Sequence, residues 1–100
     1  MTIEIQKSEN QILAILEGEL DTAAAAGAEV SLQPLLESDG KDVVIDCTHL
    51  EYIASSGLRL FLGILKKAKS VGSRVVLRNV NDVVKDVLEL TGFISIFEFE

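Results

Sequence analysis

The amino-acid sequence predicts a single α/β domain in which strands and helices alternate along 100 residues. Two short apolar runs, Val43-Val44-Ile45 and Val75-Val76-Leu77, indicate strands that are buried on both faces. Between them, apolar residues from Leu58 to Ala68 recur at helical spacing. Two buried strands joined by a helix are typical of a parallel pair. The expected order is β-β-α-β-α-β-α-β, with a mixed sheet and helices mainly on one face, as one domain over residues 1–100.

The chain begins with two segments that predict a hairpin. Polar and apolar residues alternate from Thr2 to Lys7, which indicates a half-exposed strand. Ile12 to Leu16 is wholly apolar and indicates a buried strand, which Gly18 to Thr22 should end. The connection Ser8-Glu9-Asn10 is too short for a crossover, so we expect these two strands to be antiparallel.

Capping residues mark the expected helices. The first should be capped by Asp21 or Thr22 and be kinked or restarted by Pro34, and the second should be capped by Ser55 or Ser56. Gly72 suits a left-handed end of the second helix.

A third helix and a last strand complete the pattern. Asn81 can cap the helix, and Gly92 should stop it. Its expected apolar face consists of Val83, Val84, Val87, Leu88 and Thr91. Residues 94–99 then indicate a strand at a sheet edge.

Composition excludes several classes of function. The net charge of −7 repels phosphate backbones, so we expect no nucleic-acid partner. The cluster Lys66, Lys67 and Lys69 is either a solvated helix face or an anion site. The longest apolar run is far shorter than the roughly 20 residues that span a bilayer, so we expect no membrane insertion.

The single cysteine and the N-terminus both predict a cytoplasmic protein. Cys47 cannot form an intramolecular disulfide, and it is either a buried thiol in a strand or a reactive one. Residues 1–5 carry no basic region and no long apolar stretch, unlike a signal peptide.

Binding in open α/β sheets takes place beyond the carboxyl ends of the parallel strands. We therefore expect residues 18–22 and 46–57 to meet there.

The second of these segments carries a specific motif. Val43 to Leu58 closely resembles the signature of STAS domains, the anti-sigma factor antagonist family: an apolar strand ending in Asp, a loop, an aromatic-apolar pair and then Asp-Ser-Ser-Gly-Leu. Further resemblances follow in order at Gly18-Glu19-Leu20-Asp21, Asn79-Val80 and Leu90-Thr91-Gly92-Phe93. One position departs from the signature, because Ala54 stands where Asp is preferred.

The resemblance implies a STAS-like mixed sheet and a phosphorylation switch in a bacterial partner-switching pathway. It implies that Ser55 receives the phosphate, with Ser56 as second choice, and that Asp21 and Asp46 flank the site. The implied partner is an anti-sigma factor, often itself a serine kinase of the histidine-kinase-like ATPase type, and a phosphatase would reset the switch. The expected partner-binding residues are Asp21, Thr22, Asp46, Ala54, Ser55, Ser56, Gly57, Leu58, Leu60 and Ile64.

Other interpretations stay open. Ser55 and Ser56 could serve only as helix caps, and the domain could instead be an unphosphorylated regulatory subunit of an ABC-type transport complex, which Ala54 favours. Leu60, Gly63 and Ile64, beside Arg59 and Lys67, form either a docking patch or a packing contact with another helix.

Catalysis has little support in the sequence. A serine nucleophile needs an adjacent base, and the only histidine, His49, is expected in a surface loop. The Gly-x-Ser-x-Gly elbow, a metal-binding pattern and a Gly-rich phosphate loop are all missing. We expect a binding protein with no cofactor.

Overall fold

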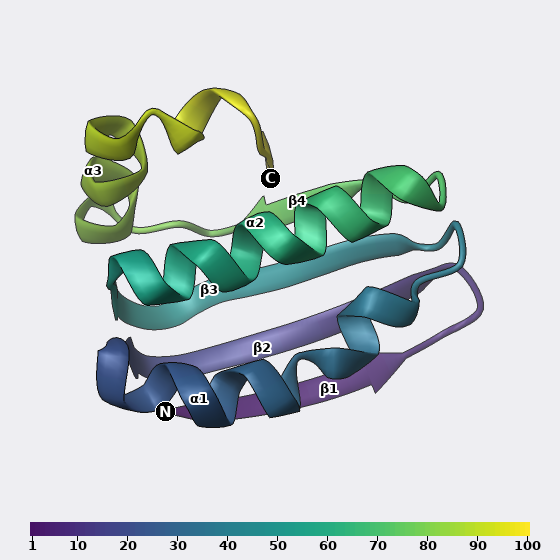
Figure 1. Ribbon diagram of the computed structural model, residues 1–100, viewed down its shortest axis with the longest axis horizontal. Helices are drawn as coiled ribbons and strands as arrows, with labels where there is room; N and C mark the ends of the chain where they lie inside the picture. The colour runs from purple at the N-terminus through teal and green to yellow at the C-terminus, as the bar shows by residue number, and fades with distance from the viewer.

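A five-stranded mixed sheet forms one layer of the domain and the helices form the other (Figure 1). The computed structural model describes all 100 residues. The strands lie in the order β1-β2-β3-β4-β5, and only β1 is antiparallel to its neighbour. The elements are β1 (Thr2–Lys7), β2 (Gln11–Leu20), α1 (Thr22–Ser31), η1 (Gln33–Glu37), β3 (Asp42–Ile53), α2 (Ser55–Ser70), β4 (Val75–Arg78), α3 (Asp82–Thr91), η2 (Phe93–Ser95) and β5 (Glu98–Phe99).

The topology explains why the helices share one face. From β2 onward each strand pairs in parallel with the next, so all three crossovers step across the sheet in the same direction. Right-handed crossovers of this kind place their helices on the same side. Alternate residues of β2, Ile12, Ala14 and Leu16, face that side and are buried, whereas Leu13 and Ile15 are only half-buried on the other face. The predicted order and one-sided packing are confirmed.

Two strands run further than the sequence predicted. β2 continues through Gly18 to Leu20, and β3 continues to Ile53 instead of giving way to a loop after Asp46. Register shifts in the pairing between β2 and β3 interrupt the usual alternation of buried and exposed residues. In β3 the buried positions become Cys47, Leu50 and Ile53, which are three residues apart. The two-residue alternation of apolar and polar residues that indicates a strand is therefore missing from this part of the sequence.

The helix signals were largely correct. Asp21 caps α1, with its carboxylate accepting a hydrogen bond from the Ala24 amide at 2.9 Å. Pro34 opens η1, and Asn81 caps α3. Gly72 and Gly92 both have positive φ angles after their helices, as left-handed ends require.

Three expectations need correction. The residue that precedes α2 as its cap is Ala54, so Ser55 and Ser56 lie inside the first turn. Val83 is 53 % exposed and Thr91 is also exposed, so neither belongs to the buried face of α3. Most of the predicted last strand is η2 and a turn, because Phe97 packs edge-on against Phe61 in the core and leaves only Glu98–Phe99 to pair with β4.

No helix combines the length and apolar character needed to cross a bilayer.

Candidate functional site

The carboxyl ends of β2 and β3 bring two distant segments together. Leu20 pairs with Ile53 in the parallel register, and the Ala54 amide donates a hydrogen bond to the Leu20 carbonyl at 2.9 Å. Asp21 and Thr22 therefore lie beside Ala54–Gly57, which we call the β3–α2 junction. This meeting of segments was predicted from the sequence.

Gly57 holds the start of α2 against the sheet. A Cβ atom at this position would lie 2.7 Å from Leu20 Cγ and 2.9 Å from Ile53 Cγ1. Contacts that short do not occur between real side chains, so the first turn of α2 reaches this depth only because residue 57 is glycine. The close approach fixes where Ser55 stands relative to the ends of both strands.

The two serines of the junction have different surroundings. Ser55 is exposed, and its hydroxyl has no hydrogen-bond partner within the domain. Ser56 is half-buried, and its hydroxyl donates to Thr22 Oγ1 at 3.4 Å. Ser55 is therefore the more accessible hydroxyl for chemical modification.

The amino end of α2 is open to an anion. Ala54 has no side chain that could accept a hydrogen bond, so no side chain caps the first-turn amides. Free amides and the helix dipole together favour negative charge at such an end. The neighbouring carboxylate of Asp21 is engaged by the first turn of α1, which orients it at the same end of the sheet.

Asp46 does not flank Ser55, which corrects the sequence prediction. It pairs with Ile15 and Arg78, seven positions before Ile53 along β3. At about 3.3 Å per residue, this places Asp46 roughly 20 Å from the junction. Residues 46–53 are part of β3, where the sequence predicted a loop. Asp46 instead accepts hydrogen bonds from the amide and the hydroxyl of Thr48.

These contacts give Asp46 an acid-dependent contribution to stability. Partial burial raises its pKa, but the Thr48 hydrogen bonds and the charges of Arg78 and His49 together lower the pKa below its usual value. A carboxyl whose pKa is lower in the folded state stabilises the fold above its unfolded pKa, and that stability disappears as the pH falls through the folded pKa. We expect Asp46→Asn to lower the free energy of unfolding at pH 7 and to flatten its decline in acid. Urea denaturation between pH 7 and pH 3 tests this, and parallel pH profiles for the variant and wild type would contradict it.

Cys47 and His49 are poorly placed for catalysis. Burial, with a further contribution from the Asp46 charge, raises the pKa of the Cys47 thiol to about 12, so the thiol stays protonated at neutral pH. His49 is exposed on β3 beside Glu17 and is hydrogen-bonded to neither serine of the junction. No three His, Cys, Asp or Glu side chains gather where they could hold a metal ion.

Three predicted docking residues on α2 prove to differ in exposure. Leu58 and Ile64 are 1 % and 2 % exposed and belong to the core, so packing is their main role. Leu60 is half-buried and lines a groove between α1 and α2. Sequence reasoning missed Tyr52, which is 40 % exposed near the end of β3. The buried positions near the end of β3 are Leu50 and Ile53, so Tyr52 lies between them and faces solvent. This three-residue spacing of apolar residues is the sequence feature that could have indicated its exposure.

Comparisons with known proteins agree with this architecture. The family model described as STAS domain matches residues 2–100. The chain is 33 % identical over 97 residues to BtrV of Bordetella bronchiseptica, a protein named as an anti-sigma factor antagonist, covering 97 % of this chain and 84 % of that protein. It is 29 % identical over 98 residues to the anti-sigma-B factor antagonist of Bacillus subtilis, covering 98 % of this chain and 89 % of that protein.

Solved structures share the fold. An anti-sigma factor antagonist from Mycobacterium paratuberculosis superposes with a TM-score of 0.81 at 23 % identity, covering 98 % of this chain and 83 % of that one. Unphosphorylated SpoIIAA superposes with a TM-score of 0.74 at 18 % identity, covering 99 % of this chain and 87 % of that one. With a family match along almost its whole length, the chain belongs to the STAS domain family.

Proposed function

We propose that this protein is an anti-sigma factor antagonist of a bacterial partner-switching pathway, controlled by phosphorylation of Ser55. One observation carries the proposal: Ser55 is exposed, with an unengaged hydroxyl, at a helix start that no side chain caps. Its relatives in Bordetella and Bacillus are named as anti-sigma factor antagonists, which supports the same class of partner. SpoIIAA, which shares the fold, has been solved in both unphosphorylated and phosphorylated forms.

The proposed cycle has three proteins and no cofactor bound to this one. The unphosphorylated domain binds an anti-sigma factor through the β3–α2 junction with Asp21 and Thr22. That partner is also a serine kinase of the histidine-kinase-like ATPase type, and it transfers phosphate to Ser55. A separate phosphatase restores the free hydroxyl. The domain itself acts by binding in the cytoplasm and catalyses no reaction.

Phosphorylation would act on the interface and leave the fold intact. A phosphate adds about −1.5 to −2 charge, and the uncapped amides of α2 can donate hydrogen bonds to its oxygens. The added charge and bulk stand beside Asp21 on the surface that meets the partner. A partner surface that is complementary to a neutral hydroxyl would then bind the phosphorylated domain more weakly. The phosphate would at the same time interact favourably with the dipole of α2.

Mapping the modified residue tests the proposal. The wild-type domain is incubated with its anti-sigma factor kinase and Mg-ATP, and the phosphate is located by mass spectrometry. We expect it on Ser55, absent in Ser55→Ala and unchanged in Ser56→Ala, which serves as the matched control. Phosphate on Ser56, or none on either serine while the kinase is active on another substrate, would refute the assignment.

Ala54 favours a second candidate function. The family signature prefers a carboxylate before the serine pair, and its loss leaves a neutral junction. A neutral junction also suits a domain that docks without phosphorylation as a regulatory subunit of an ABC-type transport complex. Purification of the tagged domain from its host separates the two: a transport nucleotide-binding subunit with unmodified Ser55 supports the second function.

A further inference from the structure

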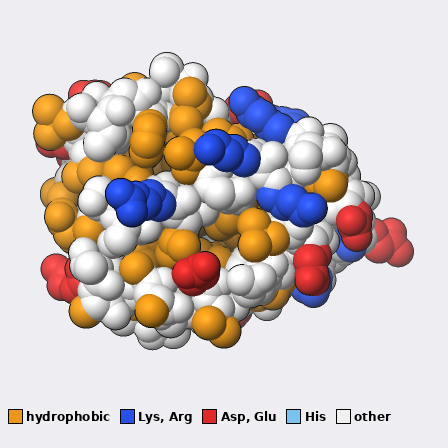
Figure 2. All heavy atoms as spheres, in the orientation of Figure 1, with side chains coloured by type: hydrophobic (Ala, Val, Ile, Leu, Met, Phe, Trp, Pro, Cys, Tyr) orange, Lys and Arg blue, Asp and Glu red, His pale blue; other side chains and the backbone are white.

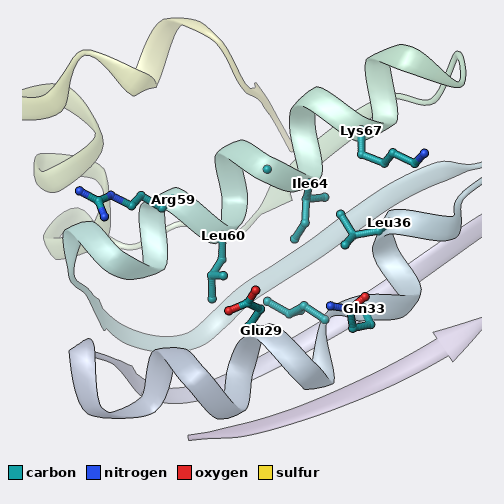
Figure 3. Close-up of a pocket in the computed structure, with 9 residues that line it drawn as sticks. Glu29, Gln33, Leu36, Arg59, Leu60, Ile64 and Lys67 are labelled. Carbon is teal, nitrogen blue, oxygen red and sulfur yellow. The ribbon is translucent and has the colours of Figure 1, made fainter.

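A groove runs between α1 and α2 and opens to solvent on the helix side of the domain (Figure 3). Its volume is about 410 Å³, and its apolar lining comes from Leu32, Leu36, Leu60 and Ile64. Figure 3 shows Leu60 and Ile64 extending from α2 towards α1, with Leu36 entering from the opposite side. Glu29 and Gln33 complete the lining, so the groove is a shallow, mainly apolar trough between two helices with one carboxylate on its α1 side, which is a shape suited to a third helix.

Gly63 leaves open space on the wall that α2 contributes. It lies in the interior of α2, where glycine is less favourable than alanine by about 1 kcal/mol. A Cβ atom there would meet nothing within 4 Å, so the fold itself gives no reason for glycine. This differs from Gly57 in the same helix, which the core requires. An open glycine in a groove allows a neighbouring backbone to approach α2 closely.

Two cations lie at opposite ends of the groove. Arg59 and Lys67 project from α2 eight residues apart, which is about 12 Å along a helix (Figure 3). Neither forms an ion pair within the domain, although the chain as a whole carries a net charge of −7. Figure 2 shows basic side chains spaced along this surface beside exposed hydrophobic ones. Unpaired cations of this spacing complement two carboxylates about two helical turns apart on a docked helix.

We propose that this groove receives an amphipathic helix of the anti-sigma factor, which packs apolar side chains against Gly63 and Leu60 and directs two carboxylates to Arg59 and Lys67. The inference rests on the proposed function and extends it, because it adds a second contact area. The two areas are continuous: Arg59 follows Ser55 by four residues, so both side chains lie on one side of α2. A phosphate on Ser55 would also lie within reach of Arg59 and would compete for the cation that the partner needs.

Filling the space above Gly63 gives the sharpest test. We expect Gly63→Leu to raise the melting temperature by roughly 4–8 °C, because leucine favours helix and meets open space. The same change should weaken binding of the anti-sigma factor at least thirtyfold in isothermal titration calorimetry. Gly27→Leu is the matched control, since Gly27 also lies in a helix with nothing within 4 Å but is outside the groove. It should melt as high and bind like wild type.

Charge reversal tests the two cations separately. Arg59→Glu with Lys67→Glu changes the net charge from −7 to −11, and so does Lys66→Glu with Lys69→Glu on the same helix outside the groove. At equal salt concentration, we expect the groove pair to lose at least ten times more affinity than the control pair.

The outcomes distinguish the groove from the junction. If the anti-sigma factor binds wild type and Gly63→Leu equally, or if Gly63→Leu melts below wild type, the groove inference is wrong while the proposed function stands. If the anti-sigma factor does not bind wild type at all, both fail. If the groove variants instead bind the anti-sigma factor like wild type but sediment differently when no partner is present, the occupant of the groove is a second copy of this chain. The inference is then overturned.

Discussion

Gly57→Ala should lower the free energy of unfolding by about 2 kcal/mol, although alanine is the better helix former. The added methyl group would stand 2.7 Å from Leu20 Cγ and 2.9 Å from Ile53 Cγ1, both in fully buried side chains with little freedom to retreat. Either the core is strained or the first turn of α2 moves away from the sheet. For a domain of this size, the loss corresponds to a melting temperature lower by roughly 8–16 °C.

Two controls separate overpacking from a general effect of replacing glycine. Gly63→Ala makes the same chemical change in the same helix, where nothing lies within 4 Å, and should stabilise the domain by about 1 kcal/mol. Leu20→Ala removes two of the three atoms that the new methyl group meets, Leu20 Cγ and Cδ2, and leaves Ile53 Cγ1 in place. Gly57→Ala should therefore cost clearly less in that background than in wild type, as a double-mutant cycle by urea denaturation would measure. Equal effects of the two glycine substitutions would disprove the close approach.

Ser55→Asp should strongly weaken binding of the anti-sigma factor without disturbing the fold. The new carboxylate lies at the uncapped start of α2, where negative charge stabilises a helix, so folding is not impaired. At the interface it adds charge beside Asp21 and places a desolvated carboxylate where the partner meets a hydroxyl. A mismatch of about 3 kcal/mol lowers affinity more than a hundredfold. Calorimetry measures the affinity, and backbone chemical shifts report on the fold.

Ser8→Asp is the matched control for net charge. Ser8 is exposed in the turn between β1 and β2, at the opposite end of the sheet from the junction. It makes the same change from −7 to −8 and should leave affinity within about threefold of wild type. Chemical-shift changes spread over the whole sheet in Ser55→Asp would show that the switch alters the fold, which is the opposite of our account.

The sequence was sufficient for most of the fold because local signals agreed with one another. Asp21, Asn81, Gly72 and Gly92 each perform the terminal role that their chemistry predicts. The continuation of β3 past Asp46 was not predictable from alternation, because the register shifts against β2 change the spacing of inward-facing residues. Because β3 continues as a strand through these two shifts to Ile53, Asp46 lies far from the candidate site.

The meeting of the segments that carry Asp21 and Ser55 was predictable, because both follow the carboxyl ends of neighbouring parallel strands. The exposure of the residues around this candidate site was less predictable. Leu60 and Ile64 both line the groove, but helical spacing could not show that Ile64 is almost fully buried in the core whereas Leu60, one turn earlier, is only half-buried. Nor could the sequence show that Gly57 is required by the core and Gly63 is not, since only the packing around each glycine separates them.

The most direct test compares two forms of the same protein. The domain is prepared unphosphorylated and stoichiometrically phosphorylated on Ser55, and each form is titrated with the anti-sigma factor while backbone chemical shifts of the free forms are recorded. Our account predicts a dissociation constant at least a hundredfold higher for the phosphorylated form, with shift changes confined to residues around the β3–α2 junction. Equal affinities of the two forms would contradict it.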